Sequence, residues 1–430
     1  MTDNMKKVLI ITYYWPPTGG SGVQRWVKFA KYLRNFGWEP VIYTPENPEQ
    51  LAKDDSLIAD VPADVEVIRR PIMEPYKLYR KFFRSGDKGA GVNQMNSQKK
   101  TFKQRLAVLA RGNLFVPDPR VGWVRPSVRF LRKYLKDNPV DAIVTSGPPQ
   151  SMHLIGLKLK QKTGVRWLAD FRDPWTEVYY FKHMGLFPWT AARHRRLEQK
   201  VLDNADTIIA VTSYVQADFQ ARTSTPVELI TNGYDQDDFT DTPPVLPADK
   251  FTVVHTGIMA SDGNPLRLWD VLARKCSEDS NFRKQLRIRL AGPTDGEIFE
   301  ALKVRGLGDN VDNLGYISHT QTIQEQRSAN VLIMPLREEP ELAKILPGKI
   351  FEYLAARRPI LGIGQEKGAV ADVLKDAGAG VIYDWDRTEP VRNFIESAWE
   401  RHLIGEDDAP KGEIAKYSRL ELTRKLTEIL

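Results

Sequence analysis

The sequence contains a single cysteine, Cys276, among 430 residues, so it offers neither a disulfide framework nor a cluster of cysteine metal ligands. Uninterrupted apolar runs are also short, and none approaches the roughly 20 residues that a transmembrane helix needs. The run 8–11 that follows Lys6 and Lys7 is too short for the apolar region of a signal peptide. We therefore expect a cytoplasmic protein that is neither exported nor integral to a membrane.

Positive charge is concentrated in one segment of the chain. Between Lys77 and Lys136 there are 16 Lys or Arg residues and two acids, a net charge of +14, whereas the whole chain carries +7 and the remainder therefore −7. Aromatic side chains alternate with the first of these cations, as in the run 76–84. This pattern favours docking on an anionic membrane surface. A solvated helix face with a loop is the alternative, and nucleic-acid binding is disfavoured.

Short apolar runs alternate with helical patterns along the chain, which predicts α/β architecture with parallel sheets. We expect strands at 6–12, 38–44, 64–68, 141–145, 166–170, 207–211, 228–231, 251–256, 286–290, 311–317, 331–335 and 360–363. We expect helices at 23–35, 151–160, 191–204, 267–276, 320–328 and 420–430.

The length and the linkers predict the domain organisation. A chain of 430 residues is too long for one ordinary core, and a proline-rich linker follows residue 240. We expect two Rossmann-like domains that face each other across a cleft. The predicted limits are 1–240, with a basic insertion at 74–136, and 241–415, followed by a terminal helix at 416–430 that packs back on the first domain.

Two groups of residues in the first half lie where predicted strands end, which is where open α/β sheets bind ligands. Gly19 and Gly20 form a glycine-rich turn between the first strand and helix, where a ligand turn and a structural turn are equally good interpretations. Asp170 and Asp173 share one short loop with an arginine and a tryptophan, which favours a functional role. His153 lies in the first turn of a predicted helix and is more typical of a packing residue.

The stretch 344–358 is the strongest binding candidate in the second half. Gly348 and Lys349 fall in the first turn of a predicted helix, where free backbone N–H groups and the helix dipole attract anions. Glu352 follows one turn later on the same face, where a carboxylate can accept hydrogen bonds from ribose hydroxyls. Gly257 directly follows another strand and fits a second turn facing phosphate. The spacing suits a nucleoside diphosphate, although a surface ion pair is the alternative.

Several of these motifs, in this order, resemble the retaining nucleotide-sugar glycosyltransferases of GT-B fold, the glycogen-synthase-like group that includes bacterial surface-polysaccharide enzymes. The similar stretches are 14–22 with Arg25, 170–175, 232–235 with Phe239, and 347–355. The resemblance implies an N-terminal acceptor domain and a C-terminal nucleotide-sugar domain. It also implies that Glu352 holds the ribose and that Gly19, Gly20, Gly348 and Lys349 surround the diphosphate. No cofactor or metal ion is expected.

The chain departs from the family pattern in two places. The arginine and lysine that usually follow the first glycine of the second half are not evident in 258–264, and Arg267 is the nearest candidate. A second glutamate is usual eight residues before the ribose glutamate, and here that residue is Lys344. Two interpretations stay open: Glu339 or Glu341 substitutes for the missing glutamate in a rearranged loop, or Lys344 serves as a phosphate cation.

The resemblance predicts a glycosyltransferase that moves a sugar from a nucleoside diphosphate sugar to a hydroxyl of a glycan or polyprenyl-linked acceptor in cell-surface polysaccharide biosynthesis. Asp173 is the best candidate for orienting that hydroxyl, with Asp170 and His153 as further candidate catalytic residues. The enzyme would work peripherally on the inner face of the cell membrane. Two alternatives stay open: a nucleotide-sugar 2-epimerase of the same fold, and a non-enzymatic basic membrane-binding scaffold.

Overall fold

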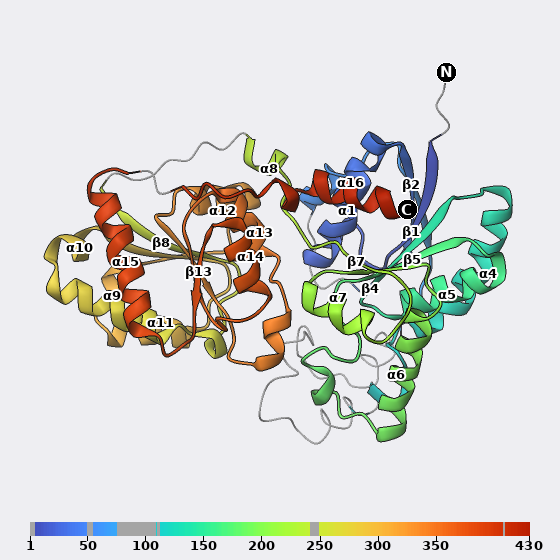
Figure 1. Cartoon of the computed structure of the whole chain (residues 1–430), viewed down its shortest axis with the longest axis horizontal. Helices are drawn as coiled ribbons and strands as arrows, with labels where there is room; N and C mark the ends of the chain where they lie inside the picture. Colours follow the sequence, from blue (N-terminus) through green and yellow to red (C-terminus); the bar gives the residue numbers. More distant parts are fainter. Residues whose placement is uncertain (1–4, 50–54, 75–108, 110–111, 241–248, 407–408) are drawn as a thin grey trace. The chain divides into compact units, whose positions relative to one another are not determined.

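The computed structural model describes residues 5–49, 55–74, 109, 112–240, 249–406 and 409–430 (Figure 1). Contacts between residues divide the chain into two compact units. The N-terminal unit comprises Met1–Thr231 and Arg419–Leu430, and the C-terminal unit comprises Asn232–Ser418. Within the described ranges, no helix combines the length and the hydropathy that crossing a bilayer requires.

The N-terminal unit is built on a parallel sheet of seven strands in the order β3-β2-β1-β4-β5-β6-β7. The strands are β1 (Lys6–Ile11), β2 (Trp38–Pro45), β3 (Glu66–Arg70), β4 (Ala142–Gly147), β5 (Arg166–Phe171), β6 (Thr207–Ala210) and β7 (Val227–Leu229). From β1 the chain first adds strands on one side of the sheet (β2, β3) and then on the other (β4 to β7). The carboxyl ends of β1 and β4 therefore form the topological switch point at which such folds bind ligands.

Helices cover both faces of this sheet, because successive strand residues point to opposite sides. Leu9 and Ile11 join one apolar core, whereas Val8 and Ile10 join the other. The first core lies under α4 (Val121–Asp137), α5 (Ser151–Thr163), α6 (Pro188–Leu202) and α7 (Ser213–Gln220). The second lies under α1 (Ser21–Leu33) and α16 (Arg419–Ile429), which lie side by side in Figure 1. The end of the chain thus completes the core of its first half.

The C-terminal unit has a parallel sheet of six strands in the order β10-β9-β8-β11-β12-β13. Its strands are β8 (Phe251–Thr256), β9 (Leu286–Ala291), β10 (Val311–Gly315), β11 (Val331–Pro335), β12 (Ile360–Ile363) and β13 (Gly380–Tyr383). Its helices are α8 (Asp237–Thr240), α9 (Leu266–Glu278), α10 (Ser280–Gln285), α11 (Gly296–Val304), α12 (His319–Arg327), α13 (Lys349–Ala356), α14 (Ala369–Ala377) and α15 (Thr388–Leu403). One apolar core joins α9, α10, α11 and α15 to the sheet.

The predicted fold class is confirmed, since both units are Rossmann-like parallel α/β structures. The predicted strands occur within a few residues of the ranges given above. Sequence reasoning gave no prediction for β13 or for several helices, among them α7, α11, α14 and α15. Most of the predicted basic insertion at 74–136 lies outside the described residues, and its last part forms α4.

Candidate functional site

A cavity of about 210 Å³ opens at the carboxyl edge of the C-terminal sheet. Its floor comes from residues that end or follow three neighbouring strands: Thr256, Gly257 and Ile258 after β8, Ala291, Gly292 and Pro293 after β9, and Tyr316 and Ile317 after β10. Thr322 of α12 and two residues of α13, Lys349 and Glu352, complete the wall. The position is the one at which parallel α/β sheets bind ligands.

Two glycines let the backbone form the cavity floor. Gly292 has a φ of 117°, and a Cβ atom there would lie 2.5 Å from the carbonyl oxygen of Gly257. Gly257 has a φ of 104°, and a Cβ atom there would lie 3.0 Å from the Nζ atom of Lys349. Both positions therefore require glycine, because a side chain would meet the neighbouring turn or the lysine. The result is a close approach of α13 to the end of β8.

Lys349 is the cation of this cavity. Burial lowers the pKa of its ammonium group to about 8, and Glu352 partly offsets this effect. The Nζ atom lies 3.3 Å from Nε2 of His255, whose Nδ1 lies 3.1 Å from the carbonyl oxygen of Ile333. Nε2 also lies 3.4 Å from the carbonyl oxygen of Ile258. A carbonyl only accepts and an ammonium group only donates, so the tautomer that satisfies both Ile333 and Lys349 has its proton on Nδ1 and accepts from Lys349 at Nε2. Burial, followed by the charge of Lys349, lowers the pKa of His255 to about 3, which keeps the histidine neutral.

Glu352 is held by a residue that sequence reasoning missed. The buried side chain of Gln326 on α12 donates to Oε2 of Glu352 at 3.1 Å and to the hydroxyl of Thr256 at 3.0 Å. The hydroxyl of Tyr353 accepts a hydrogen bond of 2.9 Å from the backbone N–H of Thr256 and ties α13 to the end of β8. The carboxylate is thus oriented with its second oxygen available to a ligand.

The structure does not bring every predicted donor residue into this cavity. Gly257, Lys349 and Glu352 line it, whereas Lys344 and Gly348 are exposed and are not among its lining residues. Gly348 caps α13 with helical backbone angles and has open space where a Cβ atom would be. Gly19 and Gly20 belong to the N-terminal unit, where Gly20 has a φ of 106° and precedes α1. The roles assigned to these four residues stay predictions.

Asp170 lies at the centre of a buried network in the N-terminal unit. Its carboxylate accepts from Arg25 at 2.9 Å, from Trp26 at 2.8 Å and from Ser146 at 2.9 Å. Burial alone would raise its pKa, but Arg25 and these hydrogen bonds hold the pKa below the usual value. Its hydrogen-bonding capacity is used within the protein, so the geometry fits a residue that positions the loop after β5.

Asp173 is placed differently on the same loop. Its carboxyl group is only partly exposed, and among the described residues it has no hydrogen bond or ion pair. Burial raises its pKa to about 6, although the neighbouring charge of Arg172 lowers it. Arg172 itself is fixed by the carbonyl oxygens of Gly147 and Pro148 and lies over the ring of Tyr14. A recessed carboxyl with a raised pKa is suited to exchanging a proton near neutral pH.

His153 is fully buried, and its ring contacts the side chains of Thr145 and Phe171. Trp167 donates to the hydroxyl of Thr145 at 2.9 Å, and that hydroxyl lies 2.9 Å from Nδ1 of His153. The indole only donates, whereas the hydroxyl has one donor and two acceptor sites, so it can either donate to Nδ1 or accept from it. The Nε2 atom is buried and has no hydrogen-bond partner among the described residues. Burial lowers the pKa of His153 to about 3, and the ring stacks on Phe171 at 4.3 Å. It is a neutral residue packed beside the strand ends.

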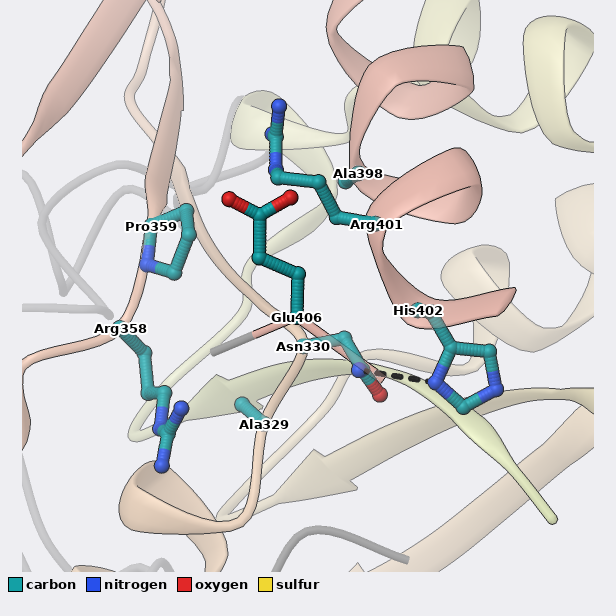
Figure 2. Close-up of a pocket in the computed structure, with 8 residues that line it drawn as sticks. All are labelled: Ala329, Asn330, Arg358, Pro359, Ala398, Arg401, His402 and Glu406. Carbon is teal, nitrogen blue, oxygen red and sulfur yellow. Dashed lines mark hydrogen bonds between the residues drawn. The ribbon is translucent and has the colours of Figure 1, made fainter. Parts of the chain in front are cut away.

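A second, much smaller cavity lies at the opposite edge of the C-terminal sheet, at the amino ends of β11 and β12 (Figure 2). Its volume is about 10 Å³, which suits one water molecule and no substrate. Asn330 spans it, with 3.3 Å between its Nδ2 atom and Nδ1 of His402, and also bonds to Thr252. Among the described residues, no group of three or more His, Cys, Asp or Glu side chains could hold a metal ion.

Comparison with known proteins identifies the class. The family model of the glycosyl transferase 4-like domain matches residues 19–233, half of the chain, so the protein belongs to this family. It is a glycosyltransferase built from two Rossmann-like units, as the sequence predicted. No curated protein sequence matches it.

Solved structures share the fold at low sequence identity. Sucrose-phosphate synthase (tll1590) from Thermosynechococcus elongatus superposes with a TM-score of 0.62 at 14% identity, over 99% of this chain and 98% of that one. Anabaena Alr3699/HepE in complex with UDP-glucose superposes with a TM-score of 0.59 at 15% identity, over 99% of both chains. The lipopolysaccharide outer core galactosyltransferase WaaB superposes with a TM-score of 0.56 at 13% identity, over 98% of both chains. At these identities the likeness concerns the fold alone.

Proposed function

We propose that the protein transfers a sugar from a nucleoside diphosphate sugar to a hydroxyl group of a glycan or polyprenyl-linked acceptor in cell-surface polysaccharide biosynthesis. The observation that carries this proposal is the cavity in which Lys349, Glu352 and the Gly257 turn meet. The binding of UDP-glucose by HepE and the lipopolysaccharide pathway of WaaB, both of similar fold, support the substrate classes.

The donor is held by charge at one end of α13 and by a carboxylate one turn later. Lys349 and the positive end of the α13 dipole bind the diphosphate against the Gly257 turn. Gly348, Lys344, Gly19 and Gly20 add further contacts to this group. Glu352, held by Gln326, accepts hydrogen bonds from the ribose hydroxyls. Since preorganised positive charge stabilises the departing diphosphate, the reaction needs no metal ion or cofactor.

The acceptor is oriented by the loop after β5. Asp173 accepts the hydrogen bond of the attacking hydroxyl, because its carboxyl has no partner within the described part of the protein. Asp170 and His153 position this loop and the strand ends beside it. We propose that the transfer retains the configuration of the sugar, and that the enzyme works peripherally on the cytoplasmic face of the cell membrane, where a lipid-linked acceptor resides.

A ligand screen tests this function. The melting temperature of the protein is measured with UDP-, GDP-, ADP- and dTDP-sugars, each beside the free sugar. We expect one nucleotide series to raise it, and the rise to vanish in Lys349→Met and Glu352→Gln. Product anomers, analysed by NMR in the presence of a chelator, then test the retention of configuration and the independence of metal ions.

The alternatives differ in the outcome of the same screen. A 2-epimerase would bind the nucleotide sugar and invert its configuration at C2 without any acceptor. The product would have the same mass as the substrate and a different NMR spectrum. A membrane-binding scaffold would show no stabilisation by any nucleotide. Either result would replace the transferase proposal.

A further inference from the structure

An exposed apolar patch lies at the start of α6 in the N-terminal unit. Trp189 is 70% exposed and Phe187 42%, and their rings stack with centroids 4.9 Å apart. Leu114 (72% exposed) and Leu109 (36%) come from an earlier segment of the chain. Large aromatic side chains are rarely left this exposed without a partner, because their burial is strongly favourable.

The patch is held as one platform by Asn113. Its amide group donates to the carbonyl oxygens of Leu109 at 2.9 Å and Gly185 at 3.1 Å, and its oxygen accepts from the N–H of Phe187 at 2.8 Å. Gly112 packs closely below, since a Cβ atom there would lie 2.9 Å from the side chain of Leu186. The exposed side chains therefore project from a fixed backbone.

A stripe of cations continues from Trp189 along α6. Arg193, Arg196 and Lys200 follow at helical spacing, so they share the face of Trp189 over about 16 Å of helix. All three are exposed and make no ion pair with any described residue. The one acid of α6, Glu198, lies on the opposite, buried face, where it binds Thr176 and Arg222. The stripe thus carries uncompensated positive charge.

We propose that Leu109, Leu114, Phe187 and Trp189, together with Arg193, Arg196 and Lys200, form a docking surface for a bilayer with anionic lipid headgroups. This inference rests on the proposed function, in which the acceptor is lipid-linked, and it names the surface that reaches the lipid. The aromatic rings enter the interfacial region while the cations bind lipid phosphates along the plane of the helix.

Charge complementarity favours an anionic bilayer over a second copy of the chain. A two-fold interface would bring this cationic stripe against itself, whereas anionic lipid neutralises it. The helix α4 also exposes cations, such as Arg129 and Arg132, but no large apolar side chain of α4 is strongly exposed beside them. In α6 both features occur together, with the stacked rings of Phe187 and Trp189 at the start of the cationic stripe.

Vesicle flotation of the full-length protein tests the surface. We expect binding to phosphatidylglycerol–phosphatidylcholine vesicles, weakened by salt, and little binding to phosphatidylcholine alone. Trp189→Ser should reduce binding roughly tenfold. Each cation near an anionic surface should raise the vesicle partition coefficient roughly fivefold. The double variant Arg193→Glu/Arg196→Glu should therefore lower that coefficient by more than an order of magnitude.

Matched control variants lie in the C-terminal unit. Val304→Ser removes an apolar side chain that is 82% exposed, and Lys284→Glu/Lys303→Glu reverses two exposed cations. We expect both controls to bind vesicles as the unaltered protein does. Equal melting temperatures across the series show that the variants are folded.

Several outcomes would overturn the proposal. They are absence of binding to anionic vesicles, equal losses in the controls, or a loss that follows Arg129 and Arg132 of α4 instead of α6. A dimer in sedimentation that Trp189→Ser dissociates, without vesicle binding, would make the patch a self-interface. The melting shift caused by the nucleotide sugar is measured in the same variants without lipid, so failure of the docking surface and failure of the transferase assignment are told apart.

Discussion

Replacing Lys349 by methionine should make the protein more stable and less able to bind its donor. Burial lowers the pKa of this lysine from 10.5 to about 8, so the folded state disfavours its charge. That difference corresponds to about 3 kcal/mol at neutral pH. Because solvent reaches the cavity, we expect the free energy of unfolding to rise by about 1–3 kcal/mol in Lys349→Met.

The sign of the pH dependence follows from the same pKa. Between pH 8 and 10.5 the unfolded chain binds the lysine proton and the folded protein does not, so stability rises with pH in that window. The advantage of Lys349→Met should therefore shrink as the pH rises from 8 to 10.5. Donor affinity of the unaltered protein should fall through the same window as the cation is lost.

The loss of affinity follows from Coulomb's law. One unit charge about 4 Å from a phosphate charge contributes about 4 kcal/mol at an effective dielectric constant of about 20. We expect Lys349→Met to raise the dissociation constant of the nucleoside diphosphate, measured by calorimetric titration, by roughly 30- to 1000-fold. Lys375→Met, at an exposed lysine of α14, is the matched control. It should change neither the free energy of unfolding nor the affinity for the donor. A destabilised Lys349→Met, or unchanged donor affinity, would refute the reasoning.

Three further predictions concern neighbouring groups. Gln326→Leu removes the hydrogen bond that orients the Glu352 carboxylate, so it should lower the preference for a ribonucleoside over a 2′-deoxyribonucleoside diphosphate roughly tenfold. The preference is measured as a ratio of dissociation constants. An unchanged ratio would leave Gln326 a packing residue. Gly292→Ala should destabilise the protein by more than about 2 kcal/mol, whereas Gly348→Ala should be nearly neutral in denaturant unfolding, and equal effects would contradict the described turn. Asp173 has a pKa raised to about 6, so its ionisation costs stability as the pH rises from 3.8 to 6. Asp173→Asn should therefore be more stable at pH 7 and nearly inactive, and an unaltered pH–rate profile below pH 6 would exclude Asp173 as the titrating group.

The sequence predicted the fold well because buried parallel strands leave a local signal. Runs such as Val331–Pro335 are apolar on both faces and are bounded by turn residues, and each of them became a strand. The strand β13 (Gly380–Tyr383) was not predicted; it lies at the edge of the sheet and only one of its four residues is buried, so it lacks the continuous apolar run of the central strands.

The candidate site was predicted only where its signal is local. Gly257, Lys349 and Glu352 stand at the end of a strand or the start of a helix, and the structure gathers them in one cavity. Gln326 has no such mark, because its role arises from the packing of α12 against β8 and α13. The buried pair between Asp170 and Arg25 joins residues 145 positions apart, and no pattern along the chain announces it.

We propose that the start of α13 binds the diphosphate of a nucleotide sugar. A crystal structure with the donor found in the ligand screen tests it most directly. We predict the diphosphate within hydrogen-bonding distance of Lys349 Nζ and the Gly257 turn, with the ribose hydroxyls on Glu352. A donor bound elsewhere, with Lys349 still hydrogen-bonded to His255, would refute the assignment of this cavity as the donor site.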